Sequence, residues 1–188
     1  ISAGATTGTA SFTPTDDSVY EGNETGIVAI DSVSGGSANE SGTPQSVTIT
    51  ITENESAPTV TLTTSASSIA ENAGSSLTLT ATLSVATTAD VTVALSTSGT
   101  ATEGTDYTDG SGAVDDIVIS AGSTTGTVSF TPTDDSIYDA TSNETATIAI
   151  SGVSGGSATE SGDQSVTITI TDNESAPTVT LSRSASAI

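Results

Sequence analysis

A repeat of about 119 residues is the feature that most constrains how this chain can fold. Residues 11–18 (Ser-Phe-Thr-Pro-Thr-Asp-Asp-Ser) recur without change at 129–136, and residues 54–62 (Asn-Glu-Ser-Ala-Pro-Thr-Val-Thr-Leu) recur at 173–181. Solenoid repeats have periods of roughly 20 to 50 residues, so a period of this length corresponds to a whole domain. The repeat therefore predicts similar domains arranged in tandem.

The phase of the repeat divides the chain into three parts. We expect residues 1–58 to be the C-terminal half of one repeat, residues 59–177 to be a complete repeat, and residues 178–188 to open the next. The joint at 175–177 (Ser-Ala-Pro) is short and contains a proline, which limits the movement of neighbouring domains. We expect the sequence to be a window of a longer repeating polypeptide, in which further residues or a neighbouring molecule cover residues 1–58.

The strands are predicted from apolar residues that alternate with Thr and Ser. In the segment 77–83, for example, Leu and Ala occupy every second position, which is typical of a strand with one buried face. Such segments lie at residues 77–83, 91–95, 128–130, 148–150 and 166–170, and short flanking strands are expected at 60–62 and 117–119. No stretch has helical periodicity. The pattern predicts an all-β fold of tandem immunoglobulin-like antiparallel β-sandwiches with about seven strands each.

The charge of the chain is strongly one-sided, with 23 Asp and Glu residues against a single basic residue and a formal net charge of −22. Nucleic acid and anionic membrane surfaces are excluded as partners, because binding them requires Lys and Arg. The apolar runs are too short for membrane insertion. Self-repulsion of this size destabilises a compact state unless counter-ions bind, and divalent cations are the obvious candidates.

The acidic residues of the complete repeat gather near the predicted strand ends. They are Glu71, Asp106, Asp134, Asp135, Asp139, Glu144, Asp172 and Glu174. The ends of alternate strands of an antiparallel sandwich lie together at one pole, so these carboxylates can converge. Oxygen ligands in this number suit Ca²⁺. The alternative is that each acid is a solvated turn residue.

Recurrence favours the metal site over the turn interpretation. Acids at the same phase of the preceding repeat provide its candidate ligands, which are Asp16, Asp17, Glu21, Glu24, Glu53 and Glu55. Several Ser, Thr and Gly positions outside the identical segments change between the two repeats.

Several segments of residues 59–177 together resemble the Calx-beta domain, a family found in sodium/calcium exchangers and in tandem in large bacterial surface proteins. They include Ile-Ala-Glu-Asn-Ala-Gly at 69–74, Gly-Thr-Asp-Tyr at 104–107 and Ile-Thr-Ile-Thr-Asp-Asn-Glu at 168–174. The resemblance implies a seven-stranded sandwich with several Ca²⁺ ions at the pole next to the following domain. The family's calcium positions correspond to Glu71, Asp106, Asp134, Asp135, Glu144 and Asp172.

The leading functional hypothesis is a calcium-binding structural spacer or stalk in a long secreted adhesin or extracellular fibre. We expect it outside or on the surface of a bacterial cell, with neighbouring repeats of the same chain and laterally packed copies in a fibre as its partners. The alternatives are a module that recognises a glycan or protein through its loops and a calcium sensor. Tyr107 and Tyr138 are candidate sugar-stacking platforms for the recognition module, but packing beside the polar loops is the favoured interpretation of both.

We do not expect an enzyme. His, Cys and Lys are absent, which leaves a catalytic carboxylate pair as the remaining chemistry. Glycosidases that use such a pair need a cleft lined by aromatic residues, and aromatics make up only 3% of this chain.

Overall fold

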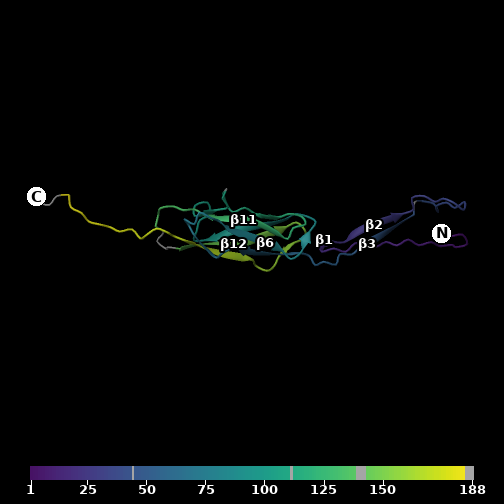
Figure 1. The fold of residues 1–188 in the computed structure, drawn as a ribbon, viewed down its shortest axis with the longest axis horizontal. Coiled ribbons are helices and arrows are strands. Elements are labelled where there is room, and N and C mark those ends of the chain that lie inside the picture. Colours follow the sequence, from purple (N-terminus) through teal and green to yellow (C-terminus); the bar gives the residue numbers. More distant parts are fainter. Residues whose placement is uncertain (44, 111, 139–142, 185–188) are drawn as a thin grey trace.

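The computed structural model describes residues 1–43, 45–110, 112–138 and 143–184. A central β-sandwich is flanked by a β-ribbon toward the N-terminus and by an extended segment toward the C-terminus (Figure 1). The prediction of an all-β fold is confirmed. Within the described residues there is no helix of the length and apolar character needed to cross a membrane.

The sandwich consists of two five-stranded sheets. In spatial order, the first sheet contains β10 (Ile117–Ile119), β8 (Val91–Gly99), β12 (Asn143–Ser154), β14 (Ser165–Thr171) and β5 (Ser68–Ala70). The second contains β13 (Thr159–Glu160), β4 (Thr59–Thr64), β6 (Leu77–Leu83), β11 (Thr125–Pro132) and β9 (Tyr107–Thr108). The long strands pair in antiparallel fashion, whereas the short edge strands β5 and β13 are parallel to their neighbours. The expected number of about seven strands is not confirmed, because short strands extend both sheets.

The core lies between the two sheets and is built from the alternating faces of the long strands. In β6, Leu77, Leu79, Ala81 and Leu83 are buried, and the threonines between them are more exposed. All residues of the described core cluster lie between positions 60 and 170. The repeat at 59–177 therefore encloses a core of its own.

Two aromatic residues close one part of this core. The rings of Tyr107 and Phe130 stack with centroids 4.6 Å apart, and Tyr107 is only 1% exposed. This burial overturns the interpretation of Tyr107 as a sugar-stacking platform.

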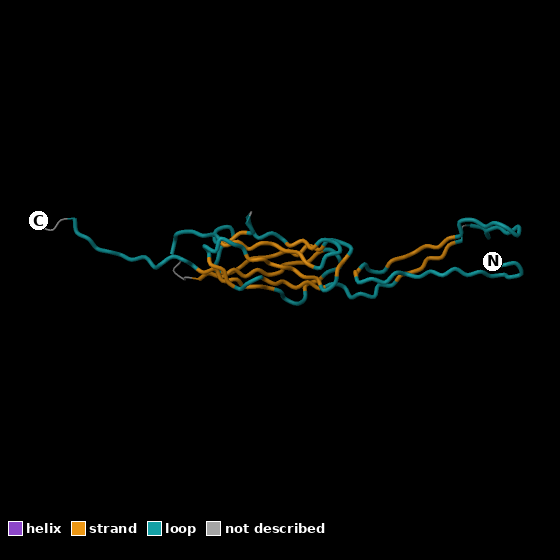
Figure 2. The backbone as a smooth tube through the Cα atoms, viewed as in Figure 1, coloured by secondary structure: helices purple, strands orange, loops and turns teal. Residues whose placement is uncertain are grey.

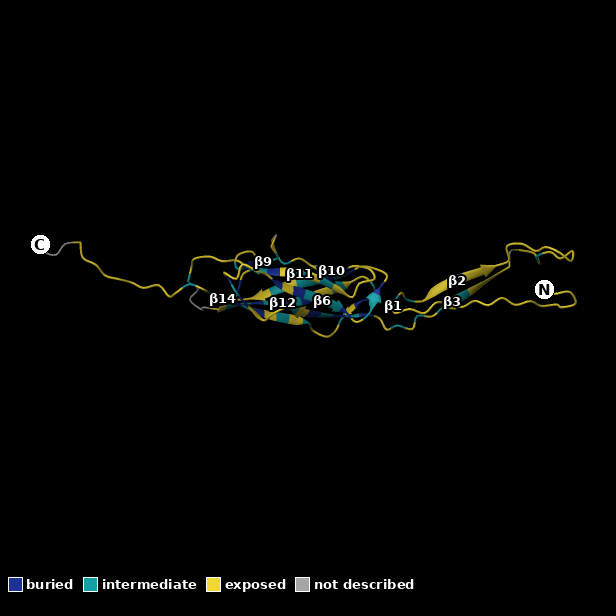
Figure 3. Ribbon diagram, viewed as in Figure 1, coloured by how far each residue is buried: buried dark blue, intermediate teal, exposed yellow. Residues whose placement is uncertain are grey.

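The remaining strands lie on the N-terminal side of the sandwich or connect to it. The strands β2 (Glu24–Ala29) and β3 (Ser46–Ile51) form an antiparallel ribbon whose residues are mostly exposed (Figure 3). A short strand, β1 (Val19–Tyr20), pairs in parallel with β7 (Ala86–Thr87) of the sandwich. After β14, the described residues continue as a loop without strands to position 184 (Figure 2).

Candidate metal centre

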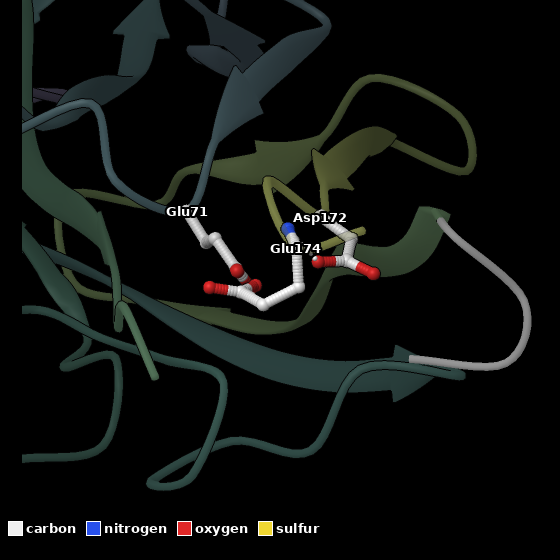
Figure 4. Close-up of side chains that lie close together, drawn as sticks. All are labelled: Glu71, Asp172 and Glu174. Atoms are coloured by element: carbon white, nitrogen blue, oxygen red, sulfur yellow. Dashed lines mark hydrogen bonds between the residues drawn. The ribbon is translucent and has the colours of Figure 1, made fainter. Parts of the chain in front are cut away.

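Three carboxylates meet where two neighbouring strands of the first sheet end. The strands β5 and β14 run parallel, with Ala70 opposite Thr171, so the residues that follow them leave the sheet side by side. Glu71 follows β5 and Asp172 follows β14, and the backbone N–H of Glu71 donates to the carbonyl of Thr171 at 3.1 Å. One carboxylate oxygen from each of Glu71, Asp172 and Glu174 lies within 4.8 Å of the others (Figure 4). We call these three residues the Glu71 cluster.

A turn of the backbone brings Glu174 back toward the sheet. Oδ1 of Asp172 accepts a hydrogen bond from the backbone N–H of Glu174 at 2.8 Å, in the manner of an Asx turn. The side-chain amide of Asn173 donates to Oε1 of Glu174 at 3.0 Å. Glu71 is 7% exposed, whereas Asp172 and Glu174 are half-buried, so the cluster extends from the protein interior to the surface.

One oxygen of the Glu71 cluster lacks a hydrogen-bond partner. Among the described residues, Oε2 of Glu174 is a buried side-chain oxygen that accepts no hydrogen bond. Burial of an ionised oxygen without a donor or cation is costly, so the arrangement needs a proton or a cation between the carboxylates.

The pKa of Glu174 is raised from 4.5 to about 7 by the same arrangement. The main cause is a proton shared with the carboxyl group of Glu71, followed by a similar interaction with Asp172, by burial and by repulsion from both carboxylates. When this proton leaves, the three carboxylates carry like charges at close range, which a divalent cation can neutralise.

Asp134 lies beside the Glu71 cluster rather than within it. It lines a hollow together with Glu71, Gly74, Ser76 and Thr131. The cluster of oxygens within 4.8 Å does not include Asp134 in the described part of the chain, and its side chain is exposed.

The other predicted ligands of this repeat occupy different positions. Asp106 accepts a hydrogen bond from the backbone N–H of Thr102 at 2.6 Å, and its carbonyl accepts one from Thr133 at 2.9 Å, which ties its loop to the segment before Asp134. Asp135 is exposed and binds the backbone N–H of Ile137. Glu144 is half-buried in β12, opposite Ile170. Asp139 lies outside the described residues.

The preceding repeat has a second group of acids at the equivalent end of its ribbon. All six of its predicted ligands line one hollow beyond β2 and β3: Asp16, Asp17, Glu21, Glu24, Glu53 and Glu55. We call these residues the Glu53 group. The fold thus brings these six acids to one end of the ribbon.

Within this group, Glu53 is held by four backbone hydrogen bonds. It accepts hydrogen bonds from the N–H groups of Glu21, Gly22, Asn54 and Glu55 at 2.6, 2.8, 2.9 and 2.9 Å. The backbone hydrogen bond from Glu55, followed by those from Glu21 and Gly22, lowers the pKa of Glu53 from 4.5 to about 2. A side-chain hydrogen bond with Glu53 raises the pKa of Glu55, and repulsion by Glu24 raises the pKa of Glu21.

The two repeats share the same hydrogen-bonded turn after their last strand. In each, the first acid after the last strand accepts the backbone N–H of the acid two residues later: Glu53 from Glu55, and Asp172 from Glu174. The sequence signal for this turn was the recurring acid-Asn-Glu at 53–55 and 172–174.

Together, the two-sheet architecture and the acidic groups at its strand ends define a β-sandwich repeat module with a candidate cation site. The Calx-beta domain model matches the chain twice, at residues 2–55 and 53–174. The chain belongs to the Calx-beta domain family, which is known for calcium binding and is not an enzyme family. A comparison with curated proteins found no match.

Proposed function

We propose that this chain is a calcium-binding structural spacer of a long secreted adhesin or extracellular fibre. The observation that carries the proposal is the Glu71 cluster, whose three carboxylates converge around an oxygen of Glu174 that no described donor satisfies. Only oxygen ligands are present there, and Ca²⁺ is the hard cation that takes six to eight of them in flexible geometry.

In this proposal Glu71, Asp172 and Glu174 hold the ion, and Asp134 closes the site from the wall of the adjoining hollow. The Glu53 group plays the same part in the preceding repeat. Bound calcium neutralises the clustered charge and fixes the segment that leads from β14 into the joint, because Asp172 and Glu174 lie only a few residues before Pro177.

The joint itself supports a spacer role. Pro58, the counterpart of Pro177, is buried, and its carbonyl accepts a hydrogen bond from the backbone N–H of Thr159 at 3.1 Å. The next residue, Thr59, donates its N–H to Oγ of Ser84 at 2.9 Å. The linker is thus bonded to the domain that follows it, which restricts bending between repeats.

The recognition module is less well supported, because Tyr107 is buried in the core and cannot stack on a ligand. We also propose that the chain has no catalytic activity and works outside the cell, next to other repeats of its own chain and to laterally packed copies.

Calorimetric titration with CaCl₂ at pH 8 tests the proposal. We expect binding with a Kd of about 0.1 mM, as in extracellular calcium modules, and weaker binding of Mg²⁺. Glu174→Gln should weaken calcium binding by about tenfold or more. The matched control is Asp163→Asn, which removes the same charge at the opposite end of β14 and should leave binding unchanged. The absence of calcium binding in the unaltered chain would refute the proposal.

A further inference from the structure

Two neighbouring repeats are joined by backbone pairing as well as by the covalent linker. The strand β1 belongs to the preceding repeat, and β7 belongs to the repeat at 59–177. They pair in parallel, with Val19 opposite Ala86 and Tyr20 opposite Thr87. Figure 1 shows β1 against the end of the sandwich that faces the ribbon. The sequence alone did not predict this contact, because two-residue strands have no periodicity to detect.

The strand β1 is held in position by the acidic residues on either side of it. Oδ1 of Asp17 accepts the backbone N–H of Val19 at 2.8 Å. On the other side, the backbone N–H of Glu21 donates to Glu53 at 2.6 Å. The acidic loop thus presents Val19 and Tyr20 to the next repeat.

The receiving strand is fixed by its own repeat. Thr87 is 2% exposed, its carbonyl accepts the N–H of Gly122 at 2.8 Å, and its Oγ1 donates to the carbonyl of Ala89 at 2.6 Å. Gly156 packs against it so closely that a Cβ there would lie 2.7 Å from Oγ1 of Thr87. An edge anchored in this way is a preformed site for strand addition.

The presenting loop recurs in the repeat at 59–177, where no strand pairs with it among the residues that the structure describes. Residues 16–20 read Asp-Asp-Ser-Val-Tyr, and residues 134–138 read Asp-Asp-Ser-Ile-Tyr. Oδ1 of Asp135 accepts the N–H of Ile137 at 2.6 Å, as Asp17 does for Val19. Ile137 is 67% exposed, whereas Val19 is half-buried against the following repeat.

The following repeat of the same chain is the occupant that fits this strand. Residues 173–181 repeat 54–62, so the chain leaves the repeat through the same joint and opens the same first strand. We infer that Ile137 and Tyr138 form the docking strand that pairs with the counterpart of β7 in the following repeat. This inference deepens the proposed spacer function and rests on it for the tandem arrangement, but not for the bound ion.

Cysteine cross-linking tests the pairing without interference from native thiols, because the chain contains no cysteine. Paired residues of neighbouring strands lie about 5 Å apart, which suits a disulfide. The first variant, Val19→Cys with Ala86→Cys in this chain, tests the contact seen here. The second uses two tandem copies of residues 59–177, each with its own core, and carries Ile137→Cys in the first copy and Ala86→Cys in the second.

The control for the second variant replaces Ile137→Cys by Val118→Cys in the first copy, since Val118 is similarly exposed, at 53%, on β10. Disulfide formation is followed by thiol titration and gel mobility in dilute protein, in EDTA and in calcium. We expect the 137–86 pair to cross-link within one chain about tenfold faster than the control.

The outcomes separate this inference from the proposed function. Equal rates for the 137–86 pair and its control in both buffers, or cross-links only between chains, would overturn the docking strand. Fast cross-linking that is identical in EDTA and in calcium would support the docking strand while counting against calcium as the stiffening agent.

Discussion

Replacement of Glu71 by glutamine should remove most of the stabilisation by calcium without unfolding the domain. Glu71 is the most buried member of its cluster and contributes one of three converging carboxylates. Glutamine has nearly the same shape as glutamate and keeps an oxygen that can accept the hydrogen bond from the backbone N–H of Asn173. It also adds N–H donors beside the unsatisfied Oε2 of Glu174. In EDTA, we therefore expect Glu71→Gln to be at least as stable as the unaltered chain.

The size of the calcium effect follows from mass action. Calcium at about 100 times its Kd stabilises a one-site protein by about 2.7 kcal/mol. Changes to the groups that merely support metal ligands cost about 10–100-fold in affinity, so loss of a ligand should cost about 100-fold. At the same calcium concentration the variant then keeps only about 0.4 kcal/mol. For a domain of this size, these values correspond to shifts in Tm of about 10 °C and about 2 °C.

The assay is thermal unfolding of the unaltered chain and the variant in EDTA and in 10 mM CaCl₂, followed by calorimetry. Asp163→Asn is the control for loss of one negative charge and should retain the full shift. An undiminished calcium shift in Glu71→Gln would refute the assignment of Glu71 as a ligand. Equal Tm values of the unaltered chain in EDTA and in calcium would refute the metal site itself.

Three further predictions follow from the structure. The pKa of Glu174 is about 7 in the folded chain and about 4.5 when unfolded, so between these pH values the folded chain keeps a proton on Glu174 that the unfolded chain has lost. In EDTA the free energy of unfolding, measured with urea, should therefore fall as pH rises from 5 to 8, and a rise would contradict the shared proton. Gly99→Ala should lower the free energy of unfolding by about 3 kcal/mol or more, because Gly99 has φ of 130° and a Cβ would lie 2.0 Å from the carbonyl oxygen of Thr145. The control Gly112→Ala, where a Cβ meets open space, should change it by less than about 0.5 kcal/mol in the same denaturation assay. In calcium, chains of increasing repeat number should lengthen by about 40 Å per repeat in small-angle scattering, since strands of about ten residues rise about 3.3 Å per residue and loops add the rest, and a compact globule would contradict the spacer.

The sheets and core could be predicted because the long strands bury every second side chain. The alternation in 77–83 and 166–170 was sufficient to locate β6 and β14 and their buried residues. The parallel edge strands β5 and β13 were not predicted because, unlike the short segments 60–62 and 117–119, they do not carry two large apolar residues two positions apart. They are fixed by tertiary pairing with β14 and β4.

The candidate site was predictable as a set of acids but not as a geometry. Which carboxylates meet depends on the register that places Ala70 opposite Thr171, and one residue of slippage would turn Glu71 to the other face of the sheet. Recurrence indicated the Glu53 group as a whole. It gave no sign that Glu53 accepts four backbone N–H groups, because such bonds depend on the path of the loop.

The most direct test of a calcium-binding spacer is to locate the ion. Crystals of the chain grown in saturating CaCl₂ should show anomalous difference density between Glu71, Asp172 and Glu174, with carboxylate oxygens about 2.4 Å from the peak. Oε2 of Glu174 should be among the ligands of the ion. Clear density for the three carboxylates with no cation between them would contradict it.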